Sequence, residues 1–171
     1  MFTQAMSIKD NPQALTGISV ITTPGIRWGR RDIKTVGLLA ACMAKMLAKK
    51  EGANDAWMVE DGNVTEGSSN NAYIVTPDNT LITRHLGSEI LSGITRKAVL
   101  KLAQTHEIKI EERGFTPEEA YAASEAFVTS ATTLVMPVIS IDNKPVGDGK
   151  PGPITQKLRE LYIQTALEEI D

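Results

Sequence analysis

The sequence predicts a mixed α/β or α+β domain built on a largely antiparallel sheet. Three observations predict it: several short β-branched segments alternate with a few helical ones, Pro and Gly turns separate them, and no internal repeat or linker interrupts the series. The 171 residues are 42% hydrophobic and 23% charged, which is ordinary for a domain with a real core. We therefore expect one domain over residues 1–171.

The first half of the chain is expected to hold four strands and one helix. The helix covers residues 35–50, where apolar Ala, Leu and Met are nearly continuous, and Gly52 follows at the position of a C-cap. This composition predicts a buried helix. An Asp61-Gly62 turn and a polar loop at 65–70 separate two of the strands. The expected strands are 17–22, 55–60, 71–76 and 80–83.

The second half is expected to hold three helices and three strands. Apolar residues at helical spacing predict a helix over 94–105, with its N-terminus at Ser92-Gly93. A short helix should begin at Thr116, because Pro117 and Glu119 complete a capping signal. A last helix should run from near Pro153 to the C-terminus. The expected strands are 108–113, 126–129 and 135–141.

Charge and composition restrict the kind of ligand. A formal net charge of -3 gives no basic footprint for nucleic acid, and no apolar run is long enough to span a membrane. The single cysteine, Cys42, lies in an apolar run and should pack as a small hydrophobic side chain. We therefore expect a cytoplasmic protein with a small-molecule ligand and no metal.

Lys34 is the first candidate for chemistry. It stands between an arginine-rich turn and the apolar helix, so we expect a partly desolvated amine among positive charges, which favours Schiff-base chemistry. The alternative is an exposed lysine at a helix start. Glu66, in the polar loop, could pair with a ring cation, or it could be a solvated glutamate.

Two further segments could bind an anion. Gly93, Ile94 and Thr95 lie at the first turn of the predicted helix, where free N–H groups and the helix dipole favour a phosphate. Ser92-Gly93 could instead be a simple cap. The hydroxyl-rich segment 129–133 follows a strand and offers further donors, or it is a polar turn.

Taken together, four motifs resemble the class IV aminotransferases, a family that includes D-amino-acid and branched-chain aminotransferases and aminodeoxychorismate lyase. The motifs occur in family order at 27–34, 64–69, 93–96 and 127–131. The segment before Lys34 looks most like the D-amino-acid branch. The resemblance implies the C-terminal, cofactor-binding domain of such an enzyme, with its sheet forming a pseudo-barrel flanked by helices. Gly37 and Asn70 depart from the family pattern and leave the substrate open.

The resemblance also implies a role for each site residue. Lys34 would be the catalytic lysine, forming the Schiff base with pyridoxal 5'-phosphate, and Glu66 would pair with the ring nitrogen. Arg27 would contact the cofactor region or an inter-domain carboxylate. The remaining cofactor contacts are assigned to Leu91 against the ring, to Gly93, Ile94, Thr95, Ser130 and Ala131 around the phosphate, and to Ser68 and Ser69 near Lys34.

The expected function is amino transfer between a small amino acid, D or branched-chain, and a 2-oxo acid. Two alternatives remain open: a lyase acting on an aminodeoxychorismate-like substrate, and a catalytically incomplete fragment or binding domain. Nothing in the chain corresponds to the family's N-terminal domain, so we expect half of an active site, as in a truncated or proteolysed form. The family usually assembles as dimers, which implies a homodimer.

Overall fold

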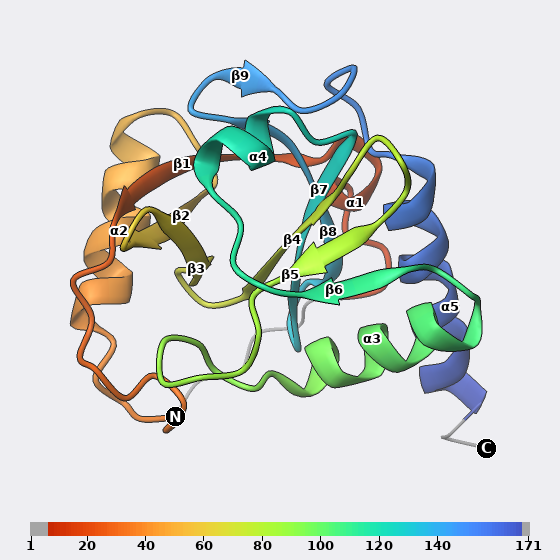
Figure 1. Ribbon diagram of the computed structural model, residues 1–171, viewed down its shortest axis with the longest axis horizontal. Helices are drawn as coiled ribbons and strands as arrows, with labels where there is room; N and C mark the ends of the chain where they lie inside the picture. The colour runs from red at the N-terminus through yellow and green to blue at the C-terminus, as the bar shows by residue number, and fades with distance from the viewer. Residues whose placement is uncertain (1–6, 169–171) are drawn as a thin grey trace.

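The computed structural model describes residues 7–168, and within that range it contains nine strands and five helices (Figure 1). The strands are β1 (Ile18–Pro24), β2 (Asp55–Glu60), β3 (Asn63–Gly67), β4 (Asn71–Val75), β5 (Leu81–Thr83), β6 (Ile110–Glu112), β7 (Glu125–Ser130), β8 (Leu134–Ile141) and β9 (Lys144–Pro145). The helices are α1 (Gln13–Thr16), α2 (Leu39–Lys50), α3 (Ile94–Thr105), α4 (Pro117–Tyr121) and α5 (Pro153–Glu168).

All the strands belong to one sheet with the order β3-β2-β1-β8-β7-β4-β5-β6, and β9 pairs with β8. The strand β1 runs parallel to both of its neighbours, β2 and β8, and β5 runs parallel to β6. The other pairs are antiparallel. The prediction of a mixed, mostly antiparallel sheet is therefore confirmed.

The sheet curls until its two ends meet. An isolated antiparallel bridge joins Val64, on the first strand of the path, to Phe115, just beyond the last one. Its hydrogen bond runs from Val64 N to Phe115 O over 2.9 Å. The curl gives the predicted pseudo-barrel, and it encloses a core in which Trp57 meets Phe115 edge to face at 5.9 Å between ring centroids. This core also contains Ile18, Val20, Ala72, Ile74, Ile82, Ala126, Val128, Met136, Val138 and Ile141.

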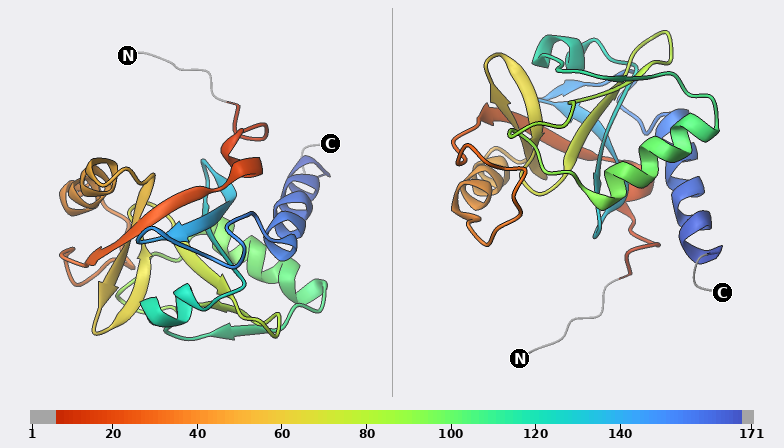
Figure 2. Two further views of the ribbon diagram at one scale, coloured as in Figure 1. Left: turned by 90° about the horizontal axis from the view of Figure 1, so that it is seen from above. Right: turned by 60° about the horizontal axis from the view of Figure 1, so that its bottom comes forward.

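Helices α3 and α5 pack against the outside of the curled sheet, as two views show (Figure 1, Figure 2). Between them and β4, β7 and β8 lies a second core, where the rings of Tyr73 and Phe127 stack with their centroids 4.4 Å apart. The helix residues in this core are Val99, Leu100 and Ala103 of α3 and Leu158 of α5. The range predicted for α3 is confirmed, although Ile94, its first apolar residue, is 75% exposed.

Helix α2 differs from its prediction. It begins at Leu39 rather than at residue 35, and it contacts β1 and β2 through the small residues Ala44 and Ala48. Its larger apolar side chains face outward: Leu39 is 75% exposed and Met46 is 72% exposed. The prediction of a buried helix is wrong because an apolar composition does not show whether another part of the protein covers the apolar face of the helix. The expected burial of Cys42 is wrong for the same reason, since its side chain is exposed.

The polar segment predicted as a loop at 65–70 is in part a strand. Residues Asn63–Gly67 form β3, which pairs with β2 through the Asp61-Gly62 turn. Both turn residues have positive φ angles, 48° and 75°, as a tight two-residue hairpin requires. The strand was missed because it carries site residues in place of the usual apolar alternation. The prediction also missed the short elements α1 and β9.

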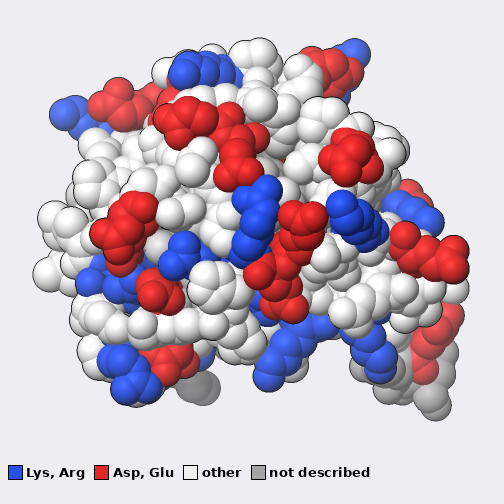
Figure 3. Space-filling model, viewed as in Figure 1, with Lys and Arg blue, Asp and Glu red and all other residues white. Residues whose placement is uncertain are grey.

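The other elements match their predictions with small changes at the ends, and the part of the last helix predicted beyond Glu168 lies outside the described residues. Thr116 and Glu119 form a reciprocal capping box at the start of α4, and β6 is shorter than the predicted 108–113. Charges of both signs are interspersed over the face shown in Figure 3. Within residues 7–168, no helix is long and apolar enough to cross a membrane, and no group of metal-ligating side chains gathers.

Candidate active site

A cavity of about 850 Å³ opens at one side of the sheet, within the size range of small-molecule sites. Four parts of the chain that lie far apart in sequence line it. They are the segment between β1 and α2 with the start of that helix, the end of β3 with the turn into β4, the segment leading into α3, and the end of β7 with its following turn. The lining contains every predicted site residue: Arg27, Lys34, Glu66, Ser68, Ser69, Leu91, Gly93, Ile94, Thr95, Ser130 and Ala131.

Glu66 lies in β3 and is buried, not solvated in a loop. One carboxylate oxygen, Oε1, pairs with Nη1 of Arg27. The other, Oε2, accepts hydrogen bonds of 3.0 Å from the backbone N–H of Leu91 and from Nδ2 of Asn71. Burial raises the pKa of Glu66 above its usual range, and the charge of Arg27 opposes this shift. The site thus holds a desolvated carboxylate in a fixed orientation.

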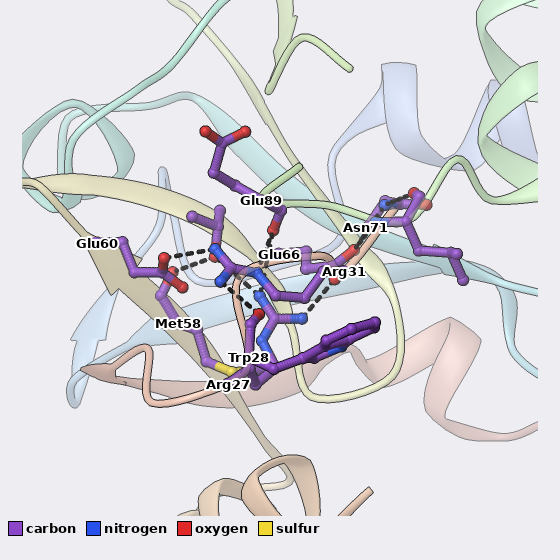
Figure 4. A network of polar contacts seen from close by, with 10 residues as sticks. Arg27, Trp28, Arg31, Met58, Glu60, Glu66, Asn71 and Glu89 are labelled. Atoms are coloured by element: carbon purple, nitrogen blue, oxygen red, sulfur yellow. Dashed lines mark hydrogen bonds and ion pairs between the residues drawn. The ribbon is translucent and has the colours of Figure 1, made fainter. Parts of the chain in front are cut away.

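Two arginines fix the segment that carries Lys34 (Figure 4). Arg27 also donates to Oγ1 of Thr65 at 3.2 Å and to the carbonyl of Glu89 at 3.4 Å. Arg31 donates to that same carbonyl at 3.1 Å, donates to the carbonyl of Trp28 at 2.9 Å, and pairs with Glu60. The two guanidinium groups therefore join this segment to β2, β3 and the loop that precedes α3.

Lys34 lines the cavity from a segment that is neither helix nor strand. Its side chain is exposed, so the expected partial desolvation is wrong in this structure. The reason is that α2 begins at Leu39, and the residues that were expected to enclose the lysine as a helical first turn extend into solvent instead, with Val36 97% exposed. The amine can reach into the cavity from its rim.

Asp55, which the sequence analysis did not identify, organises the serine turn. Its carboxylate accepts hydrogen bonds from Ser68 Oγ, from the backbone N–H of Ala56 at 2.8 Å and from Asn70 Nδ2 at 2.5 Å. Asp55 is the first residue of β2 and is buried, whereas Ser69 and Asn70 face the cavity from the turn after β3. Because Asp55 and Ser68 are not neighbours in sequence, no local motif pointed to Asp55.

One part of the cavity is suited to an anion. The N-terminus of α3 lies there, with Gly93 as its N-cap and no side chain capping its free N–H groups. The hydroxyls Ser92 Oγ and Thr95 Oγ1 are buried, and neither has a hydrogen-bond partner among residues 7–168. A side chain at position 93 would not fit, because its Cβ would lie 2.4 Å from Asn71 Oδ1. Unpaired buried donors beside a helix N-terminus favour a bound oxyanion.

The chain is similar to known proteins over most of its length. The family model for amino-transferase class IV matches residues 1–141. A D-alanine aminotransferase of Bacillus licheniformis is 41% identical over 160 residues, covering 94% of this chain and 54% of that protein. A D-alanine aminotransferase of Staphylococcus aureus (strain COL) is 42% identical over 146 residues, covering 85% and 51%. This chain thus spans about half the length of the curated relatives it matches.

Among solved structures, a branched-chain amino acid aminotransferase of Thermobaculum terrenum in its PLP form superposes with a TM-score of 0.83 at 27% identity. The superposition covers 94% of this chain and 53% of that one. A branched-chain amino acid aminotransferase of Escherichia coli gives a TM-score of 0.79 at 27% identity, covering 89% and 53%. The sequence match and these structural likenesses place the chain in the class IV aminotransferase family.

Proposed function

We propose that this chain forms the cofactor-binding side of a pyridoxal 5'-phosphate-dependent aminotransferase. The observation that carries the proposal is the cavity itself, which is lined by an exposed lysine, a buried carboxylate and an uncapped helix N-terminus. A phosphorylated pyridine aldehyde needs these three groups: a lysine, an anionic partner for the ring nitrogen and donors for the phosphate. Over residues 1–171 the chain would act as one domain of the enzyme.

When bound, the cofactor supplies an aldehyde and an electron-accepting ring. Lys34 Nζ would hold the cofactor through that aldehyde, and the freed amine would accept and return the proton of the substrate Cα. The exposed position of Lys34 at the rim leaves it free to swing between these two tasks. An amine held rigidly in the wall would have less freedom to do so.

Glu66 accepts the N–H of the pyridine ring. Its three existing hydrogen-bond partners leave acceptor capacity on the carboxylate, since an ionised carboxylate offers about four lone-pair sites. Burial raises the pKa of Glu66 despite the charge of Arg27. The negative charge of Glu66 would stabilise the cationic ring, and Arg27 favours this ionised form of Glu66 against the effect of burial. Arg27 positions Glu66 and does not contact the ring in this proposal.

The phosphate is held by the N-terminus of α3 and by the turn after β7. Ile94 and Thr95 supply backbone donors, and the unpaired hydroxyls of Ser92 and Thr95 supply two more. Ser130 and Ala131 close this end from the other side. Leu91 packs against the ring, and Ser68 and Ser69 orient the groups around Lys34.

The proposed reaction is transfer of an amino group from a small amino acid to a 2-oxo acid, with a D-amino acid as the favoured donor. The relatives named D-alanine aminotransferase support this choice, and the branched-chain enzymes with similar structures give the second donor to test. We also propose a cytoplasmic homodimer. The exposed apolar side chains Val36, Leu39, Met43 and Met46 support a partner-covered surface beside the cavity.

The test is a covalent trap. Purified chain is mixed with pyridoxal 5'-phosphate, its visible spectrum is recorded, and the adduct is reduced with borohydride and located by mass spectrometry. An adduct on Lys34 that is absent from Lys34→Ala and retained by Lys45→Ala, an exposed lysine on α2, is the expected result. Adducts spread over several surface lysines, with the same yield in Lys34→Ala, would refute the site.

Product analysis then separates amino transfer from the lyase alternative. A transaminase produces a new amino acid only when a 2-oxo acid is supplied, whereas a lyase acting on an aminodeoxychorismate-like substrate releases pyruvate without an acceptor. Turnover is measured with D-alanine and with L-leucine as donors. Amino acid formation that depends on the acceptor supports the proposal.

A further inference from the structure

Arg159, on α5, is a buried arginine that hydrogen-bonds to four backbone carbonyls. Its Nη1 donates to Thr133 O at 2.9 Å and to Val135 O at 2.7 Å. Its Nη2 donates to Ile8 O at 3.3 Å and to Lys9 O at 3.0 Å. Within residues 7–168 no carboxylate forms an ion pair with it. Burying a charge without a counter-ion costs free energy. We therefore expect the four hydrogen bonds of Arg159 to stabilise a particular backbone conformation.

That conformation is at Leu134, the residue between the two carbonyls that Nη1 bridges. Leu134 has a φ of 58°, in the left-handed region that favours glycine. It closes the short loop between β7 and β8, where it pairs with Ser130. Glycine adopts this conformation without a steric penalty, and hairpin connections usually place it where φ is positive. Because leucine stands there, an outside constraint must hold the turn, and Arg159 supplies it.

The front of the same turn faces the cavity. Thr129, Ser130, Ala131 and Thr132 line it, and Ser130 Oγ accepts the Thr133 N–H at 3.1 Å. Arg159 approaches from behind, since it is on the helix that packs outside β7 and β8. One wall of the proposed phosphate end therefore depends on a guanidinium that does not line the cavity.

We propose that Arg159 is a positioning residue for the cofactor phosphate: it holds the 130–133 turn, through the carbonyls on either side of Leu134, against the anion-binding end of the cavity. The inference rests on the proposed function and deepens it. It assigns to Arg159 an effect on the phosphate group, because the 130–133 turn lines the cavity with the N-terminus of α3, whereas Lys34 and Glu66 come from other segments.

The experiment compares two ligands that differ in the phosphate. Dissociation constants for pyridoxal 5'-phosphate and for pyridoxal are measured in the wild-type chain, in Arg159→Met and in Lys157→Met, which removes an exposed charge from the same helix. For Arg159→Met the preference for the phosphorylated ligand should fall about tenfold, the scale of one or two lost hydrogen bonds. Lys157→Met should keep the wild-type preference.

A second readout follows the turn without any ligand. Amide hydrogen exchange at Thr133, whose N–H is bonded to Ser130 Oγ, should speed up in Arg159→Met and not in Lys157→Met. Leu134→Gly added to Arg159→Met should restore part of the preference, because glycine adopts the left-handed conformation without help. If Arg159→Met fails to fold, Arg159→Lys replaces it, since lysine keeps the charge and cannot bond to all four carbonyls.

The outcomes separate the two proposals. Equal losses of affinity for both ligands, or unchanged exchange at Thr133, would overturn the role of Arg159. A wild-type chain that does not prefer the phosphorylated ligand would overturn the proposed function and the phosphate role together. In that case the exchange data would still decide whether Arg159 holds the turn.

Discussion

Arg27 and Glu66 form an ion pair that is almost completely removed from water, with side chains 10% and 7% exposed. The pair joins the segment after β1 to β3, across residues that are distant in sequence. A buried pair of this kind is tolerated because each charge neutralises the other, and removal of one partner leaves an uncompensated charge. The first prediction follows from this difference between a complete ion pair and a single buried charge.

Arg27→Met should destabilise the chain by about 3–5 kcal/mol, because Glu66 is left as a buried, unpaired carboxylate. Urea denaturation at neutral pH measures the change. Arg30→Met is the matched control: Arg30 is 58% exposed and, among residues 7–168, pairs only with Asp32, so its loss should cost less than about 1 kcal/mol. Adding Glu66→Gln to Arg27→Met should recover part of the loss. Equal costs for the two arginines would contradict the argument.

Gly93→Ala should disturb Asn71, whose side chain would lie 2.4 Å from the new Cβ. Asn71 Nδ2 bonds both Glu66 and the carbonyl of Leu91, so its displacement should loosen the ring end of the cavity and cost about 1–3 kcal/mol of stability. The affinity for pyridoxal 5'-phosphate should fall in parallel. Gly29→Ala, at a glycine whose Cβ would meet nothing within 4 Å, should change neither quantity.

Glu125→Ala should destabilise α5 by about 1–3 kcal/mol. The carboxylate of Glu125, on β7, accepts hydrogen bonds from the backbone N–H groups of Ile154 and Thr155 and from Thr155 Oγ1. It therefore caps the N-terminus of the helix from another element. Thermal unfolding compares this variant with Glu160→Ala, an exposed residue of the same helix whose loss should be nearly neutral. A neutral Glu125→Ala would show that α5 needs no such cap.

The pH dependence of stability should include a contribution from Glu119. A hydrogen bond from Arg113 holds the pKa of Glu119 below its ordinary value of 4.5. A carboxyl with a lowered pKa stabilises the fold fully above its ordinary pKa and loses that contribution as the pH falls through the lowered folded value. Urea midpoints from pH 7 down to pH 3 should therefore fall less steeply in Glu119→Gln than in the wild type. Glu118→Gln, which leaves the hydrogen bond between Arg113 and Glu119 in place, is the matched control.

Regular elements were predictable where an apolar face meets a core. Helix α3 keeps its predicted range and places Val99, Leu100 and Ala103 in the core, and α4 begins at its capping box. Strand β3 and helix α2 were not predictable in the same way. The strand carries Thr65 and Glu66 in buried positions, so its pattern looks polar, and α2 exposes apolar side chains that composition assigns to a core.

The candidate site was likewise predictable only in part. Lys34, Glu66 and Gly93 stood out because each belongs to a short motif whose residues are neighbours in sequence. Asp55, Asn71 and Arg31 support them through contacts that only the folded chain creates, such as the bond from Ser68 to Asp55 across the β2–β3 hairpin. The local sequence pattern therefore identifies the groups that would contact a ligand. It says much less about the groups that hold them in place.

The position of β1 has a consequence for how the chain reaches this fold. Its partner β8 comes more than a hundred residues later: the side chain of Asp142, just after β8, receives the Thr22 N–H and hydroxyl across a separation of 120 residues. During synthesis β1 must wait with one edge unpaired until β8 has emerged, and non-local parallel pairing is slow to form. The sheet is therefore expected to assemble late and cooperatively. Until then, the incomplete chain should bind chaperones that shield unpaired strand edges.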